Sequence, residues 1–157
     1  MIIPRRIYRE AEARLRARFT AIEEARDALE MARAMAYSAQ AAPMDPNGGS
    51  HGTGRGDALE RKAISVHEAE EELRRVLAWD DVFHRLDRIY PVDTPEGKVG
   101  WYLYQNGLTQ ADISTILGCD RQTVRRHKDI YVLNCALLAA MAGLVRMGDE
   151  DPQGNSE

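Results

Sequence analysis

Residues 108–128 read LTQADISTILGCDRQTVRRHK and contain two short helical patterns joined by a tight turn. Thr109 can cap the first helix, because Asp112 three residues later completes a capping-box pattern. Gly118 occupies the position where a left-handed backbone ends a helix, and Asp120 can cap the second helix. The side chains expected to be buried are Ile113, Ile116, Leu117 and Val124. This arrangement is typical of a helix-turn-helix whose second helix enters the major groove of DNA.

The second helix carries four polar side chains at spacings that place them on one face: Arg121, Gln122, Arg125 and Arg126. An arginine fork fits the O6/N7 edge of guanine, and a glutamine fits the N6/N7 edge of adenine. Contacts to the DNA backbone are expected from Thr109, Gln110, Thr123 and Lys128. The alternative is an ordinary helical hairpin with a solvated basic face. His127 lies one turn after Val124 and is expected to be half-buried without a catalytic role.

The chain of 157 residues has a formal net charge of −4, so attraction to DNA has to come from a local basic patch. Residues 57–96 hold eleven acidic and six basic side chains. The local excess of positive charge lies in the second motif helix and near the start of the chain, at Arg5, Arg6, Arg9, Arg14, Arg16 and Arg18. We expect the arginine-rich helix at the start of the chain to have a solvated face with intrahelical ion pairs. A secondary contact to the DNA backbone is the alternative.

The sequence predicts no enzyme, metal or cofactor site. Cys119 and Cys135 lack metal-ligand spacing, and reduced thiols are the simplest interpretation. The carboxylates of residues 68–72 are not accompanied by a Glu-x-x-His motif. No signal peptide or membrane span is evident, which predicts a soluble, cytoplasmic protein.

Two long helices precede the motif. An unbroken helix is expected over residues 4–40, and a second over 57–90, because apolar residues recur every seven positions in both. The two should form a coiled-coil-like hairpin through which the protein self-associates or binds a partner. Its seam pairs Leu15, Ile22 and Leu29 with Leu59, Val66 and Leu73. Residues 41–57, AAPMDPNGGSHGTGRGD, are rich in glycine and proline and are expected to form a mobile, non-helical loop without a nucleotide.

The helices on either side of the motif complete an all-α prediction. Thr94 and Pro95 can begin a support helix that buries Val99, Tyr102 and Leu103 and ends at Asn106-Gly107. After the second motif helix, an apolar stripe should complete the core or form a dimer face: Ile130, Leu133, Leu137, Leu138, Met141, Leu144 and Val145. The expected division is a hairpin over 1–92, a helix-turn-helix domain over 93–147, and a disordered acidic tail over 148–157.

This layout resembles the phage-encoded RinA and ArpU class of transcriptional regulators of Gram-positive bacteria, with a helix-turn-helix similar to region four of sigma factors. The residues that carry the resemblance are WYLYQNGLTQADISTILGCDRQTVRRH at 101–127, in which Tyr104 and Gly-Leu-Thr precede the first motif helix. His127 and the apolar segment after it depart from the pattern. The resemblance implies a regulator of late or packaging genes, in particular an activator, that binds a promoter and contacts RNA polymerase.

Two other functions remain open at this point. A phage small terminase subunit also combines a helix-turn-helix with helical oligomerisation, although its DNA-binding part typically comes first. A helical factor that acts on RNA polymerase or sigma without binding DNA is the other. Salt-dependent DNA affinity separates this last function from the first two.

Overall fold

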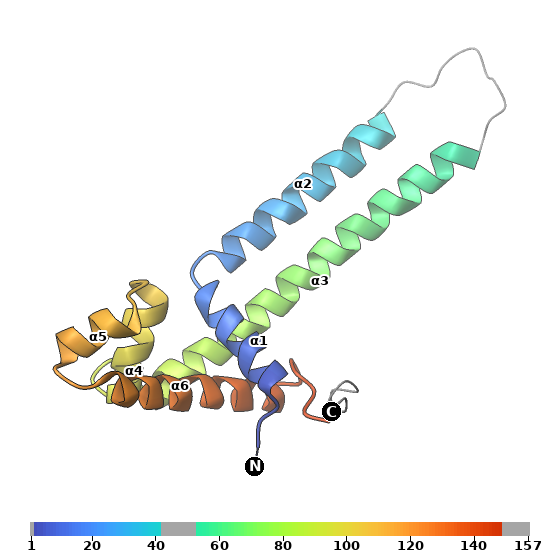
Figure 1. Cartoon of the computed structure of the whole chain (residues 1–157). Helices are drawn as coiled ribbons and strands as arrows, with labels where there is room; N and C mark the ends of the chain where they lie inside the picture. The colour runs from blue at the N-terminus through green and yellow to red at the C-terminus, as the bar shows by residue number, and fades with distance from the viewer. Residues whose placement is uncertain (1, 42–52, 149–157) are drawn as a thin grey trace, which may run out of the picture. The chain divides into compact units, whose positions relative to one another are not determined.

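The computed structural model describes residues 2–41 and 53–148, and within these ranges the chain is entirely helical, as predicted (Figure 1). The elements are α1 (Arg5–Arg16), α2 (Ala21–Ala41), α3 (Thr53–Ile89), α4 (Pro95–Gly100), the π-helical segment η1 (Trp101–Gln105), α5 (Gln110–Leu117) and α6 (Arg121–Met141). Most of the expected loop and tail, residues 42–52 and 149–157, lie outside the described ranges. No helix in the described ranges is long and apolar enough to cross a bilayer.

The contacts within the chain define two compact units. The terminal unit consists of Met1–Phe19 and Ala78–Glu157, and the hairpin unit of Thr20–Leu77. These boundaries differ from the expected division after residue 92, because α1 and the last turns of α3 share one hydrophobic core with α4, α5 and α6. The motif therefore belongs to a unit that draws on both ends of the described chain.

The predicted unbroken helix over residues 4–40 is wrong, because helical geometry is interrupted between α1 and α2. The Arg18 N–H donates to the Leu15 carbonyl at 3.3 Å, a tighter turn that ends α1. Leu15 is fully buried in the core of the terminal unit, and the Arg18 guanidinium donates two hydrogen bonds to Asp87. These tertiary contacts hold the break in place although residues 17–20 contain neither proline nor glycine.

In the hairpin unit, α2 and the first turns of α3 run antiparallel (Figure 1). The side chains buried there are Ala25, Leu29, Ala32 and Val76. Arg33 Nη2 on α2 lies 3.5 Å from Glu70 Oε1 on α3.

The predicted seam of this hairpin is therefore only partly correct. Leu29 is buried within it, whereas Leu15 belongs to the other core. Three seam residues are only half-buried: Ile22, Val66 and Leu73. The side chain of Leu59 is outside the described part of the structure. The prediction that residues 41–57 contain no helix is also wrong at its end, since α3 begins at Thr53.

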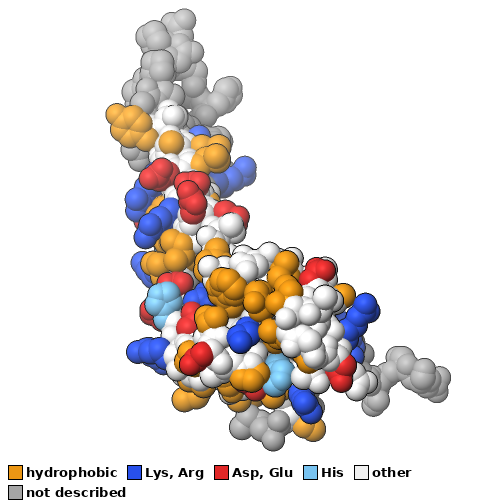
Figure 2. Space-filling model, turned by 90° about the vertical axis from the view of Figure 1, so that its left-hand side faces the viewer, with side chains coloured by type: hydrophobic (Ala, Val, Ile, Leu, Met, Phe, Trp, Pro, Cys, Tyr) orange, Lys and Arg blue, Asp and Glu red, His pale blue; other side chains and the backbone are white. Residues whose placement is uncertain are grey.

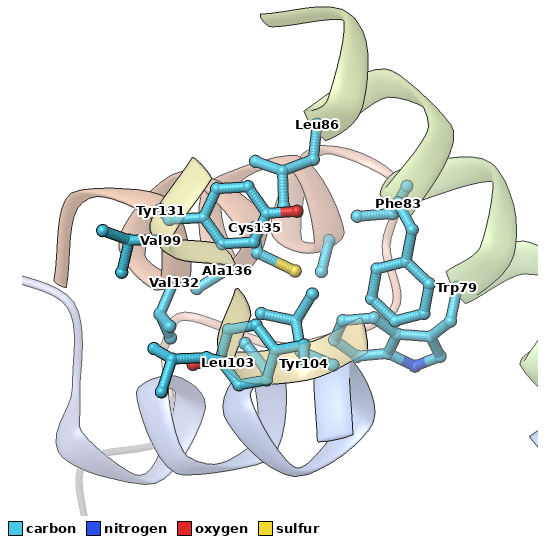
Figure 3. Packing of buried hydrophobic residues seen from close by; sticks show 14 of the residues in the cluster. Trp79, Phe83, Leu86, Val99, Leu103, Tyr104, Tyr131, Val132, Cys135 and Ala136 are labelled. Carbon is cyan, nitrogen blue, oxygen red and sulfur yellow. The ribbon is translucent and has the colours of Figure 1, made fainter. Parts of the chain in front are cut away.

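The core of the terminal unit is formed by α1, the end of α3, α4, η1, α5 and α6. Figure 3 shows the side chains of α3, η1 and α6 converging there: Trp79, Phe83, Leu86, Leu103, Tyr104, Tyr131, Val132, Cys135 and Ala136. Thr94 caps α4 as predicted, because its Oγ1 accepts from the Gly97 N–H at 3.1 Å. A Cβ on Gly100 would lie 2.7 Å from the Tyr131 ring, so glycine is what lets α4 pack this close to α6.

Candidate nucleic-acid interface

The start of α5 is fixed by the predicted capping box. Thr109 Oγ1 accepts from the Asp112 N–H at 3.2 Å, and the Thr109 N–H donates to Asp112 Oδ2 at 3.2 Å. These hydrogen bonds from the side chain and backbone of Thr109 lower the pKa of Asp112. Asp112 therefore remains a carboxylate at neutral pH, and the Thr109 hydroxyl is already engaged in the cap.

The turn between α5 and α6 also follows the sequence signals. Gly118 has φ +64°, and its N–H donates to the Ser114 carbonyl. The Asp120 side chain accepts from the Thr123 N–H at 2.6 Å and so caps α6. Backbone and side-chain hydrogen bonds from Thr123 lower the pKa of Asp120. Both helices thus have their ends set by residues within three or four positions in the sequence.

Fewer side chains are buried between α5 and α6 than the sequence predicts. Ile113 and Val124 are fully buried, and Leu117 packs partly against the core. Ile116 was expected in the same buried stripe, but its exposed fraction is 53%. The eight-residue α5 contacts its neighbours along one narrow face, so one apolar position per turn is enough to attach it.

The four side chains predicted to read DNA are all exposed on the first turns of α6: Arg121, Gln122, Arg125 and Arg126. Across residues 2–41 and 53–148, none of the four makes a side-chain hydrogen bond or ion pair. Their donors are therefore available to a ligand. Gln110 and Thr123, predicted to contact the DNA backbone, are half-buried at the first turns of α5 and α6.

Lys128 is placed differently from the other predicted contacts. Its Nζ lies 2.8 Å from Glu12 Oε1 on α1, and only 13% of its side chain is exposed. Burial alone would raise the pKa of Glu12, but the hydrogen bond and charge of Lys128, with those of Arg16, outweigh it and lower that pKa. The lysine thus joins α6 to α1 and does not lie with the four exposed side chains.

A second contact from α1 to α6 involves Tyr8 and Asp129. The Tyr8 hydroxyl donates to Asp129 Oδ1 at 2.6 Å. Burial, the hydrogen bond to Asp129 and its negative charge raise the pKa of Tyr8 above its ordinary value, while the positive charge of Arg125 opposes the rise. The seven-residue period of the first helix predicts a hairpin seam and gives no sign of this contact between α1 and α6.

α6 continues from the motif to Met141 and so includes most of the expected apolar stripe, whereas Leu144 and Val145 lie beyond its end. Of the predicted stripe only Val145 is buried, and Met141 is 81% exposed. The buried positions are instead Tyr131, Val132, Cys135, Ala136 and Ala139. Small alanines on α6 allow α1 to approach closely, so the buried face is not the one with the largest apolar side chains.

The histidine beside the motif and the two cysteines complete the titratable groups of this region. His127 Nδ1 lies 3.2 Å from Glu96 Oε1 on α4, and both side chains are largely buried, as expected for His127. Cys119 and Cys135 are free thiols, and burial raises the pKa of Cys135 to about 12. Among the described residues, no group of three His, Cys, Asp or Glu side chains could hold a metal ion. Comparison of the chain with protein-family models, curated proteins and solved structures finds no match to any of them.

Proposed function

We propose that this protein is a sequence-specific DNA-binding transcriptional regulator that uses α5 and α6 as a helix-turn-helix. The observation that carries the proposal is the cluster of four exposed side chains on the first turns of α6, whose donors have no partner within the described ranges. The capped turn and the buried Ile113 and Val124 hold that end of α6 in a fixed orientation. Pre-organised donors on an exposed helix suit recognition of a groove.

The chemistry of the four side chains matches base edges. Arg121 and Arg125 are four residues apart and point from one side of α6, with Gln122 and Arg126 beside them. Arginine binds guanine through two parallel hydrogen bonds, and glutamine binds adenine in the same way. We therefore propose that these four residues face bases in the major groove.

Contacts to the DNA backbone position the helix and carry no sequence information. Thr109, Gln110 and Thr123 lie at the cap and first turns of α5 and α6, where a helix N-terminus favours phosphate oxygens. Lys128 is left out of this set, because its ammonium group is already paired with Glu12. The interface so defined depends on the ends of two helices and on one arginine-rich face.

Because the chain is acidic overall, the attraction to DNA has to come from the motif itself. On the face drawn in Figure 2, Lys and Arg side chains are scattered among hydrophobic and uncharged ones and form no continuous basic surface. With a net charge of −4, long-range attraction of DNA is weak outside the motif. Binding should therefore fall steeply with added salt, since it depends on a few direct contacts.

Selection from a pool of random 24-base-pair duplexes, followed by fluorescence anisotropy, tests the proposal. The wild-type protein should enrich a defined sequence. Arg125→Ala should weaken binding to that sequence by about 1–3 kcal/mol, roughly 5- to 150-fold, and relax preference at particular base pairs. Arg88→Ala, an exposed arginine of α3 in the same unit, is the matched control and should change neither quantity.

Two results would overturn the proposal. One is the absence of any salt-dependent DNA binding, which would favour a helical factor that acts on another protein. The other is binding that survives simultaneous alanine substitution of Arg121, Arg125 and Arg126.

The regulatory role rests on the resemblance to phage activators. Transcription from a promoter that carries the selected site, measured with and without the protein, shows whether the protein activates or represses. Self-association through the hairpin unit has some support in exposed apolar side chains, Met31, Met35, Tyr37 and Ile64, and sedimentation measures it.

A further inference from the structure

The arginines of α1 differ in what they already contact. Arg6 Nη2 lies 3.4 Å from the Arg146 carbonyl, and the Arg14 guanidinium lies 5.8 Å from the centre of the Trp79 ring. Arg16 pairs with Glu12 at 2.9 Å. Arg5 and Arg9, in contrast, are exposed and make no hydrogen bond or ion pair with any part of the chain that the structure describes. A charge without a partner is available to an external anion.

The two unpaired arginines lie on the exposed side of α1. The opposite side carries the buried Ile7, Ala11 and Leu15. Arg5 and Arg9 are one turn apart and flank Tyr8, whose hydroxyl contacts Asp129. They are thus neighbours on α1 of the side chain that reaches Asp129, which lies one helical turn after Arg125 on α6.

The connection between α1 and α6 is close and direct. The Lys128–Glu12 ion pair and the Tyr8–Asp129 hydrogen bond both join these helices, and the charge of Arg125 reaches the Tyr8 hydroxyl. α1 and α6 cross within one core (Figure 1). Arg5 and Arg9 therefore belong to the same unit as the four exposed side chains at the start of α6. Packing within that unit, and not a linker, sets their relative positions.

We propose that Arg5 and Arg9 bind backbone phosphates of the same DNA duplex, on the strand that borders the groove entered by α6. This inference rests on the DNA-binding function proposed above. An arginine fork binds two phosphate oxygens with parallel hydrogen bonds, and it does so whatever the base sequence. The pair would supply part of the electrostatic attraction that the acidic chain otherwise lacks. An acidic protein surface is the competing partner, and the experiment below separates it from DNA.

The test compares the salt dependence of affinity for the selected duplex between wild type and an Arg5→Gln, Arg9→Gln double variant. Each phosphate contact adds about 0.9 to the slope of log affinity against log salt. Loss of two contacts should lower that slope by about 1.8, so that the fall in affinity between 50 and 200 mM salt becomes about 12-fold smaller. The base preference of the selected site should not change, because phosphates carry no sequence.

Three companion variants make the result specific. Arg5→Lys with Arg9→Lys keeps the charge and should retain most of the slope. Arg85→Gln with Arg88→Gln removes the same charge from exposed positions of α3 and should leave the slope within a few tenths of wild type. Arg125→Gln should instead alter base preference. Since Arg5 and Arg9 have no partner among the described residues, the thermal melting of their double variant should match wild type.

The outcomes distinguish this inference from the function on which it rests. Salt-dependent DNA binding with an unchanged slope in the Arg5→Gln, Arg9→Gln variant overturns the α1 contact alone and leaves the proposed function standing. A wild-type protein without DNA affinity overturns both and makes an acidic protein the better partner for these arginines. An equal loss of slope in the α3 control would also overturn the inference, because the effect would then be one of net charge.

Discussion

Replacing Lys128 with alanine should destabilise the protein and leave the proposed DNA binding unchanged. In the structure, Nζ lies 2.8 Å from Glu12 Oε1, and the two side chains are 13% and 17% exposed. A solvent-exposed pair contributes about 0.2–1 kcal/mol, whereas removing one partner of a fully buried pair costs about 3–5 kcal/mol. Arg16 still lies 2.9 Å from the same carboxylate oxygen. We therefore expect a loss of about 1–3 kcal/mol at pH 7, between these limits.

Urea denaturation followed by circular dichroism measures this loss, and its pH dependence tests the cause. The pKa of Glu12 is lowered in the folded protein, so its pairing stabilises the fold fully above the ordinary glutamate pKa of about 4.5. That stabilisation disappears as the pH falls through the folded pKa. The difference between Lys128→Ala and wild type should therefore shrink on acidification.

Lys98→Ala is the control for this experiment, because Lys98 is half-exposed and its side chain has no hydrogen bond or ion pair in the described ranges. It should leave the stability nearly unchanged at both pH values. The structural role of Lys128 is refuted if Lys128→Ala unfolds like wild type and its DNA binding loses about one unit of salt slope, which is the signature of a phosphate contact.

Three further substitutions test the packing and the caps. Leu15→Ala should lower the free energy of unfolding by about 2–5 kcal/mol in urea denaturation, and Ile22→Ala by clearly less, because the first side chain is fully buried and the second only partly. Equal losses would instead support one continuous seam through both residues. Gly100→Ala should cost about 1–3 kcal/mol by pushing against the Tyr131 ring, and unchanged melting would contradict the close approach of α4 and α6. Asp120→Ala should lower the urea midpoint at pH 7 but not below the folded pKa of Asp120, where the wild-type cap is itself protonated, and a constant difference would argue against the charged cap.

The local features of the motif could be predicted because their causes lie within a few residues. The cap at Thr109 needs only Asp112, and the cap at Asp120 needs only the N–H of Thr123. Gly118 takes the left-handed conformation that few other residues tolerate. Exposure of Arg121 and Arg125 followed from the same local periodicity.

The features that could not be predicted depend on contacts between distant segments. The seven-residue period of Leu15 and Leu29 is real, yet the two side chains enter different units. A helical period identifies a buried face and says nothing about which partner covers it. The contact of Lys128 with Glu12 joins positions that are far apart in the sequence, so a lysine on a basic helix gave no sign of its partner.

The assembly of the terminal unit from segments before residue 20 and after residue 77 has a consequence for folding during synthesis. α1 leaves the ribosome first, but α6, to which it is tied through Tyr8 and Glu12, is made more than a hundred residues later. Until residue 78 has been made, the apolar side of α1, with Ile7, Ala11 and Leu15, has no native partner in its own unit, and its contacts with α6 form last. Contacts of such long sequence separation form slowly, and an uncovered amphipathic helix is a natural binding site for a chaperone. The nascent chain should therefore depend on chaperones until α6 has emerged, whereas the hairpin unit, whose residues are contiguous, can form earlier.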